Sequence, residues 1–171
     1  LALDQPDSHA RLLPPIGPRR ISLLVHNAGL LAGGRLENER AEDIEAQFRI
    51  NALTPVLLSR ALLPAMADPA KLAIITSRMG SMADNGSGGY YGYRMSKAAV
   101  NAAGVSLAHD LKGRGIAVGL LHPGYVQTRM TGHAGHLTPA ESASLLFKRI
   151  EALNLENSGS FWHCDGAVLP W

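Results

Sequence analysis

The sequence contains little cysteine, few aromatic residues and no large excess of charge of either sign. Cys164 is its single cysteine, so an intrachain disulfide is excluded, as is typical of proteins of the reducing cytoplasm. The 16 basic and 14 acidic side chains leave a formal net charge of +2, too small to predict binding to nucleic acid or to an anionic membrane. No apolar run approaches the ~20 residues needed to span a bilayer. We therefore expect a cytoplasmic protein that binds neither nucleic acid nor a membrane.

Metal-binding patterns are equally scarce. His133 and His136 are separated like half of a metal site, but no further histidine or cysteine nearby completes a ligand set. We interpret both as surface histidines and expect no metal. What remains is an ordinary composition, 46% hydrophobic and 18% charged. A chain of 171 residues with this composition predicts a single domain over residues 1–171.

Compact apolar runs bounded by turn residues predict the strands of this domain. They occupy Ile21–Val25, Lys71–Thr76, Ile116–Leu121 and Ser160–His163, with the end of a further short strand at Leu1–Leu3. Prolines and a glycine over residues 14–18 break any helix that begins at Ser8.

Helical periodicity or capping signals predict three helices between these strands, over Ala41–Leu63, Tyr93–Lys112 and Thr138–Leu153. The first should be kinked at Pro55 and end at Pro64. The last begins with a cap residue, a proline and a glutamate that completes a capping box.

The alternation of strands and helices predicts an α/β fold with a parallel sheet covered on both faces. Ligands of such sheets bind at the carboxyl ends of the strands. The candidate functional residues of this sequence lie at those ends or on the helix that follows.

Tyr93 and Lys97 form a Tyr-x-x-x-Lys pattern at the start of the long helix. A separation of four residues places both side chains on one helical face. A lysine cation near a phenol favours the phenolate and should lower the tyrosine pKa from about 10. Tyr93 is thus a candidate general acid or base, although spacing alone is equally compatible with an exposed surface pair.

Four further patterns accompany this pair in a fixed order. Asn27-Ala28-Gly29 follows the first complete strand, Asn51 lies in the next helix, Ser77-x-x-Gly80 follows the second strand, and Pro123-Gly124 with Thr128 follows the third. Each alone could be a turn or a strand terminator. Together, over residues 25–128 and on to the C-terminal residues 164–171, they resemble the short-chain dehydrogenase/reductase family. The stretches around Tyr93 and Pro123 are most similar to its C-factor/sniffer-type carbonyl reductases.

The resemblance implies a Rossmann-like, doubly wound parallel sheet and an NAD(P)-dependent oxidoreductase that reduces a ketone or aldehyde to an alcohol. Tyr93 would exchange the proton at the substrate oxygen, and Lys97 would lower its pKa and bind the nicotinamide ribose. Ser77 would donate to the carbonyl oxygen. Asn51 would hold a water that links Lys97 to solvent.

The cofactor implied by the resemblance is NAD or NADP, with NADP slightly favoured. The residues expected to bind it are Asp4, Asn27, Ala28, Gly29, Tyr93, Lys97, Pro123, Gly124, Val126 and Thr128.

The serine assignment has an alternative. Ser77 lies sixteen residues before Tyr93 and Ser81 twelve, and the family's usual gap is nearer to that of Ser81. We favour Ser77 because it stands at a strand end, and because the glycine-rich loop Asp84–Gly89 can absorb an insertion.

The glycine-rich loop and helix with which the family begins have no counterpart in this sequence. We therefore expect an N-terminally truncated domain without the first two βα units, and weak dinucleotide binding or none by the chain as it stands. The choice between NAD and NADP depends on that region. The alternative function is a non-catalytic remnant or association subunit.

Two further expectations concern the surroundings of the site. Only seven residues separate Met130 from Thr138, which predicts an open site that accepts varied carbonyl compounds. The small residues of the Tyr93 helix allow close packing. Family resemblance implies a homo-oligomer formed through the helices Ala41–Leu63 and Tyr93–Lys112.

Overall fold

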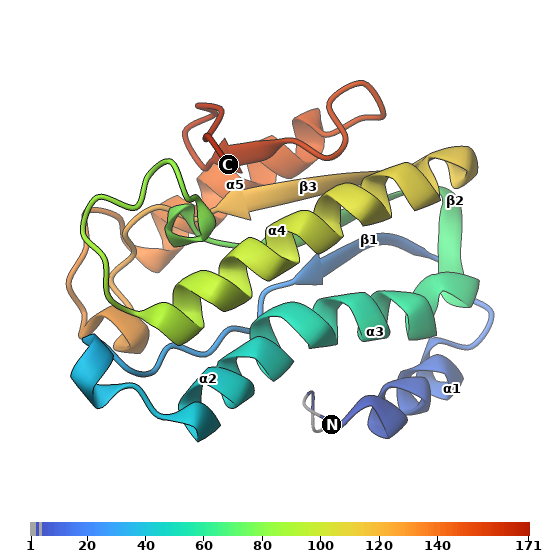
Figure 1. The fold of residues 1–171 in the computed structure, drawn as a ribbon. Helices are drawn as coiled ribbons and strands as arrows, with labels where there is room; N and C mark the ends of the chain where they lie inside the picture. Colours follow the sequence, from blue (N-terminus) through green and yellow to red (C-terminus); the bar gives the residue numbers. More distant parts are fainter. Residues whose placement is uncertain (1–2, 4) are drawn as a thin grey trace.

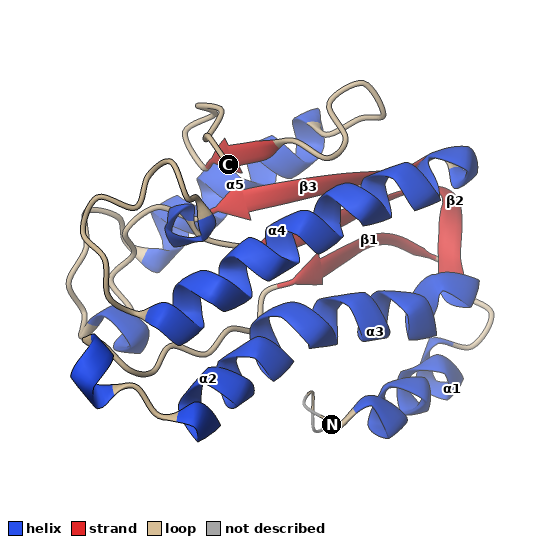
Figure 2. Cartoon of the chain, viewed as in Figure 1, coloured by secondary structure: helices blue, strands red, loops and turns tan. Residues whose placement is uncertain are grey.

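The computed structural model describes residue 3 and residues 5–171, which form a four-stranded sheet with helices on both faces (Figures 1 and 2). The predicted α/β class and the parallel, Rossmann-like sheet are confirmed. Asp4 and the short strand expected at residues 1–3 lie outside the described residues, apart from Leu3, which is in a turn.

The strands follow one another across the sheet in chain order. They are β1 (Ile21–His26), β2 (Met66–Ile75), β3 (Ile116–His122) and β4 (Phe161–His163), and every neighbouring pair is parallel. The four strands that the apolar runs predict are all present. However, β2 begins at Met66 rather than at Lys71, because Met66 pairs with Ile21 across an irregularity in the register. The sequence does not predict this extension because it contains Asp68 and Pro69, two residue types that are unfavourable in strands.

The helices are α1 (Leu13–Ile16), α2 (Ala41–Phe48), α3 (Thr54–Leu62), α4 (Tyr91–Leu111) and α5 (Pro139–Ala152), and a 3₁₀ segment, η1 (Pro6–Leu12), precedes α1. The expected capping box of Thr138 and Glu141 opens α5. Pro14 and Pro15 lie within α1, and the helical segment ends at Ile16 with Gly17 as its cap, inside the stretch of residues 14–18 expected to break it.

The predicted single helix over residues 41–63 is interrupted near Pro55. A π-turn, η3 (Arg49–Leu53), separates α2 from α3. Leu53 and Thr54 keep helical backbone angles, so the missing N–H of Pro55 removes the bond to the carbonyl of Asn51 inside the π-turn, which agrees with the distortion expected from this proline. The interruption comes before the proline and contains Asn51.

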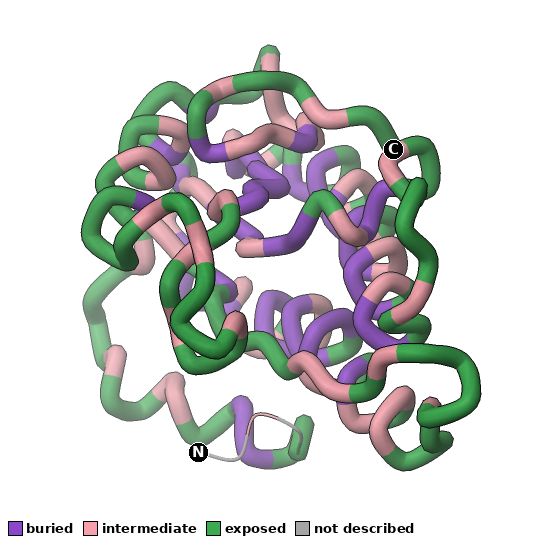
Figure 3. Tube along the Cα trace, turned by 90° about the vertical axis from the view of Figure 1, so that its left-hand side faces the viewer, coloured by how far each residue is buried: buried purple, intermediate pink, exposed green. Residues whose placement is uncertain are grey.

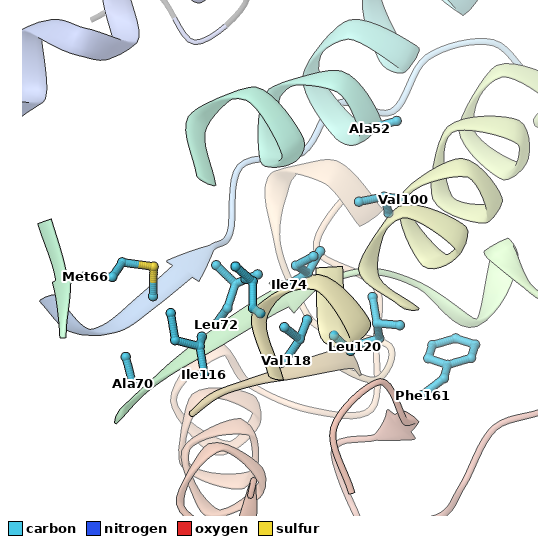
Figure 4. Close-up of a cluster of buried hydrophobic side chains, with 12 residues drawn as sticks. Ala52, Met66, Ala70, Leu72, Ile74, Val100, Ile116, Val118, Leu120 and Phe161 are labelled. Atoms are coloured by element: carbon cyan, nitrogen blue, oxygen red, sulfur yellow. The ribbon is translucent and has the colours of Figure 1, made fainter. Parts of the chain in front are cut away.

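Alternate residues of the central strands bury opposite faces of the sheet. Leu72 and Ile74 belong to a buried cluster that includes Val100 of α4 (Figure 4), while Ala73 packs with Ile150 of α5 on the other side. Figure 1 accordingly shows α3 and α4 on one face and α5 on the opposite face. Burial is concentrated between these layers (Figure 3), and β3 is buried over its whole length.

The two ends of the sheet differ. In the described part of the chain β1 pairs with β2 alone, and Val25 is 41% exposed. At the other end, the segment after β4 folds back so that Trp171 stacks on Phe161, with ring centroids 5.4 Å apart. The backbone N–H of Ala83 donates to the Trp171 carbonyl at 3.0 Å, which joins this segment to the loop after β2. Among the described helices, none has the length and apolar character that crossing a bilayer requires.

Candidate active site

Tyr93 and Lys97 lie on the first turns of α4, beside the carboxyl end of β2. They are 8% and 4% exposed, so the alternative of an exposed surface pair is wrong. The Lys97 Nζ donates to the carbonyl of Ile75 at 3.0 Å and lies 5.6 Å from the centroid of the Tyr93 ring. The helix thus holds both groups against the end of a strand.

Burial changes the acidity of both groups. It raises the pKa of Tyr93 above its usual value, and a hydrogen bond from Ser77 partly opposes that increase. It lowers the pKa of Lys97 from 10.5 to about 8. The expectation that Lys97 depresses the pKa of Tyr93 is therefore wrong for this structure. Its ammonium group lies over the face of the ring and is directed to a backbone carbonyl, and desolvation of the phenolate dominates.

Ser77, and not Ser81, contacts Tyr93. Ser77 caps the 3₁₀ turn η5 (Arg78–Gly80), and its Oγ accepts the backbone N–H of Met79 at 3.2 Å. The hydroxyl proton of Ser77 is then free to be donated to the Tyr93 hydroxyl. Ser81 is 2% exposed, and its Oγ accepts the backbone N–H of Asp84 at 3.1 Å.

Asn51 is buried in the π-turn and joins three elements. Its Oδ1 accepts the N–H of Leu30 at 2.8 Å, and its Nδ2 donates to the Leu30 carbonyl at 2.8 Å and to Ser96 Oγ at 2.9 Å. Ser96 in turn donates to the Tyr93 carbonyl at 2.8 Å. The π-turn presents Asn51 to α4 and to the segment after β1 at once, a placement common for π-turns at functional sites.

The segment Asn27–Gly29 follows β1 and is exposed. A Cβ on Gly29 would lie 3.7 Å from Asn51 Oδ1, 3.8 Å from Lys97 Nζ and 3.9 Å from the side chain of Met130. The backbone of Gly29 therefore closes one side of a space that Asn51 and Lys97 border.

Pro123, Gly124, Val126 and Thr128 follow β3 in a tightly bonded loop. The Pro123 carbonyl accepts Ser142 Oγ at 2.7 Å, and Gly124 has a φ of +84° that favours glycine. Val126 forms a bridge with Leu137, and Thr128 forms a capping box with Thr131. Met130, just after this loop, lies beside Gly29, where a Cβ would be 3.9 Å from the Met130 side chain.

Three residues near the site were not predicted from the sequence. They are Ser96, which accepts from Asn51, Met130, which lies beside Gly29, and Arg94, which donates to Ser87 of the glycine-rich loop. Ser96 and Arg94 occupy unspecified positions of the Tyr-x-x-x-Lys pattern. Their location between Tyr93 and Lys97 is the one sequence signal that could have identified them. His136 packs edge-on against Tyr125. In the part of the chain that the structure describes, no three histidine, cysteine or acidic side chains are grouped to hold a metal.

The arrangement of a serine, a tyrosine and a lysine at the end of a parallel strand is matched by a family of known sequences. The family model described as short chain dehydrogenase matches residues 15–137. The chain belongs to this family. It is therefore a member of a family of oxidoreductase enzymes, as its motifs predict.

Two curated relatives illustrate the range of this family. A 1-hydroxy-2-glutathionyl-2-methyl-3-butene dehydrogenase of Rhodococcus sp. (strain AD45) is 40% identical over 156 residues, which are 89% of this chain and 69% of that protein. The C-signal protein of Myxococcus xanthus is 41% identical over 154 residues, which are 88% of this chain and 93% of that protein.

Solved structures agree with the fold over its whole length. The carbonyl reductase Sniffer of D. melanogaster superposes with a TM-score of 0.93 at 28% identity, covering 100% of this chain and 76% of that one. The NADPH-bound carbonyl reductase from chicken fatty liver also gives 0.93, at 29% identity and with 75% of its chain covered. The predicted similarity to C-factor/sniffer-type reductases is confirmed.

Proposed function

We propose that this chain reduces a ketone or aldehyde to an alcohol with a nicotinamide cofactor, NADP rather than NAD. The observation that carries the proposal is the group formed by Ser77, Tyr93 and Lys97 at the carboxyl end of β2. An acid, a hydrogen-bond donor and a cation placed together are the parts that carbonyl reduction needs.

Tyr93 is the proposed general acid. Because burial keeps its phenol protonated at neutral pH, Tyr93 holds the proton that the reduced carbonyl oxygen must receive. Ser77 is proposed to donate its hydroxyl proton to the same oxygen, since the bond from Met79 N–H engages a lone pair of Ser77 Oγ and leaves that proton available.

Lys97 and Asn51 are the proposed path for restoring that proton. Gly29 has no side chain, which leaves a space bordered by Asn51 Oδ1 and Lys97 Nζ where a water can connect them. A pKa of about 8 lets Lys97 both give and take a proton near neutral pH. The proposed water therefore has a donor on one side and an acceptor on the other.

The donor set at this edge fits the nicotinamide ribose of such a cofactor. Within the described residues Lys97 gives one ammonium proton to Ile75, which leaves one for the proposed water and one for a ribose hydroxyl. Asn27, Ala28, Gly29, Pro123, Gly124, Val126 and Thr128 are proposed to contact the cofactor from the neighbouring strand ends. When bound, the cofactor supplies the hydride. Preference for NADP is supported by relatives whose structures contain NADPH or NADP.

A calorimetric titration of the purified chain with NADPH and then NADH tests the cofactor, and turnover of varied carbonyl compounds tests the reaction. We expect NADPH to bind, weakly if the glycine-rich loop is essential, and Tyr93→Phe to abolish turnover while leaving the titration unchanged. Turnover that survives Tyr93→Phe would refute the proposed mechanism.

A second candidate is an association or signalling role without turnover. It is favoured by the C-signal protein, of which this chain covers 93%. Under this alternative, Tyr93→Phe leaves binding to the partner intact and neither the wild type nor the variant reduces a carbonyl.

The chain is also proposed to form a homo-oligomer in the cytoplasm through its helices over residues 41–63 and 93–112. Apolar side chains on these segments are exposed, with Phe48 at 44% and Met95 at 52%. Sedimentation equilibrium of the wild type and of Phe48→Glu tests this assembly. A monomeric wild type would contradict it.

A further inference from the structure

Arg94 connects α4 to the loop that precedes it. Its guanidinium group donates to Ser87 Oγ at 2.9 Å, to the Gly89 carbonyl at 3.1 Å and, at a longer 3.4 Å, to the carbonyls of Gly88 and Met79. All four acceptors precede Arg94 in the chain, and one of them belongs to η5. The planar fork of an arginine can satisfy several acceptors in fixed directions, which a lysine cannot.

The loop that Arg94 holds has an unfavourable backbone. Gly88, Gly89 and Tyr90 have φ values of 63°, 67° and 52°, three successive left-handed residues of which the last is not a glycine. Two of the carbonyls that Arg94 binds belong to this run. The arginine therefore supplies bonds that offset the cost of the conformation.

The contact with Met79 links Arg94 to the candidate active site. The Met79 carbonyl accepts from Arg94, and the Met79 N–H donates to Ser77 Oγ. On the other side of this turn, a Cβ on Gly80 would lie 2.7 Å from the backbone of Lys97. The turn that carries Ser77 is thus fixed to α4 by close packing at Gly80 and by the charge-assisted bond at Arg94.

We propose that Arg94 is a positioning residue that sets the distance between Ser77 and Tyr93 by fastening η5 and the loop 84–90 to the first turn of α4. This inference rests on the proposed function, because the distance matters for catalysis only if both hydroxyls contact the substrate oxygen. Among the described hydrogen bonds the Arg94 guanidinium group makes none to Tyr93 or Ser77; it acts through Met79 and the loop.

Three variants test the inference. Arg94→Met removes the fork and the charge, Arg94→Lys keeps the charge but loses the fork, and Arg40→Met makes the same change at an exposed arginine outside the site. For each we measure kcat and KM for a carbonyl compound, the pH dependence of alcohol oxidation, and the ultraviolet titration of the tyrosine phenols. Tyr93→Phe in each background isolates the contribution of Tyr93.

We expect Arg94→Met to lower kcat by roughly tenfold to a hundredfold, the loss that a displacement of about 1 Å at a reacting group produces. The Tyr93 titration should move to higher pH, because a displaced Ser77 no longer donates to the phenolate. Among the described residues, the charged group that contacts Tyr93 is Lys97, which none of these variants changes. Arg94→Lys should resemble Arg94→Met, and Arg40→Met should resemble the wild type.

Three results would overturn the inference: an unchanged Tyr93 titration in Arg94→Met, full recovery in Arg94→Lys, or an equal shift in Arg40→Met. Full recovery by lysine would assign the effect to charge. The phenol titration needs no turnover. A shifted titration in a chain without reductase activity would therefore uphold the positioning role while refuting the proposed function.

Discussion

Lys97 places an ammonium group in a buried site, and the free-energy cost of burying its charge is seen in its lowered pKa. Its pKa is lowered from 10.5 to about 8 by burial, so folding favours the neutral amine. Between these two pH values the unfolded chain binds more protons than the folded one, and stability should rise with pH across this window. Below pH 8 the full penalty applies, on the order of 3 kcal/mol for a shift of this size.

Replacement of this lysine should therefore stabilise the fold at neutral pH. We expect Lys97→Met to be more stable than the wild type by about 1–2 kcal/mol at pH 7, since the lost bond to Ile75 offsets part of the gain. The difference should fall as the pH rises from 8 toward 10.5, because the folded state already holds the neutral amine there and the unfolded chain loses the same proton only as the pH approaches 10.5. Urea unfolding of both proteins at pH 7 and pH 10 measures this, and an equal difference at both would contradict it.

Gly80 is the point of closest approach between η5 and α4. We expect Gly80→Ala to cost about 1–3 kcal/mol, because its Cβ would meet the Lys97 backbone at 2.7 Å and neither backbone can move freely. Gly86→Ala is the matched control, since a Cβ there meets nothing within 4 Å and the φ of Gly86 is not positive. Thermal unfolding of the two variants compares them directly.

At the scale of elements, the π-turn between α2 and α3 fastens the segment after β1. Asn51→Ala removes its three hydrogen bonds and leaves the Leu30 backbone without these partners. We expect a loss of about 2–4 kcal/mol in stability and faster hydrogen exchange at the Leu30 amide. Asn38→Ala, at an exposed position, should change neither. Protection of Leu30 that survives in Asn51→Ala would show that other contacts hold the segment.

The sequence predicted elements whose signals are local, and it missed those set by distant contacts. Apolar runs located the four strands, and the capping box at Thr138 located the start of α5. The π-turn has no local pattern of its own, although Pro55, two residues after it, indicated a distortion of this helix. The early start of β2 depends on pairing with β1, which no propensity of Asp68 or Pro69 reveals.

The candidate active site was likewise predicted where its residues carry a local sequence signal and missed where distant contacts decide. The pattern Tyr-x-x-x-Lys and the strand end at Ser77 identified three side chains that the fold brings together. The direction of the Tyr93 pKa could not be derived from spacing, because it depends on the depth of burial. Arg94 was missed because its acceptors are loop carbonyls, whose positions depend on the backbone conformation of residues 88–90.

At the scale of the whole molecule, the edge of β1 that is unpaired in the described part of the chain is a surface at which we expect aggregation, separate from the proposed helical oligomer interface. The backbone of β1 is available to another strand in the described part of the chain, and Val25 is 41% exposed beside it. We expect Val25→Lys to reduce aggregation during storage at high concentration without lowering the unfolding temperature. Light scattering measures the first and calorimetry the second. If aggregation is unaltered in Val25→Lys, another surface of the molecule is responsible for it.

The stacking of Trp171 on Phe161, together with the bond from Ala83 to the Trp171 carbonyl, provides an intrinsic optical probe of the loop after β2. Indole emission depends on the polarity around the ring, and Trp171 is partly exposed at this contact. Ligand-induced movement of the loop can therefore be followed by fluorescence without an attached dye, with Trp162→Phe removing the second indole.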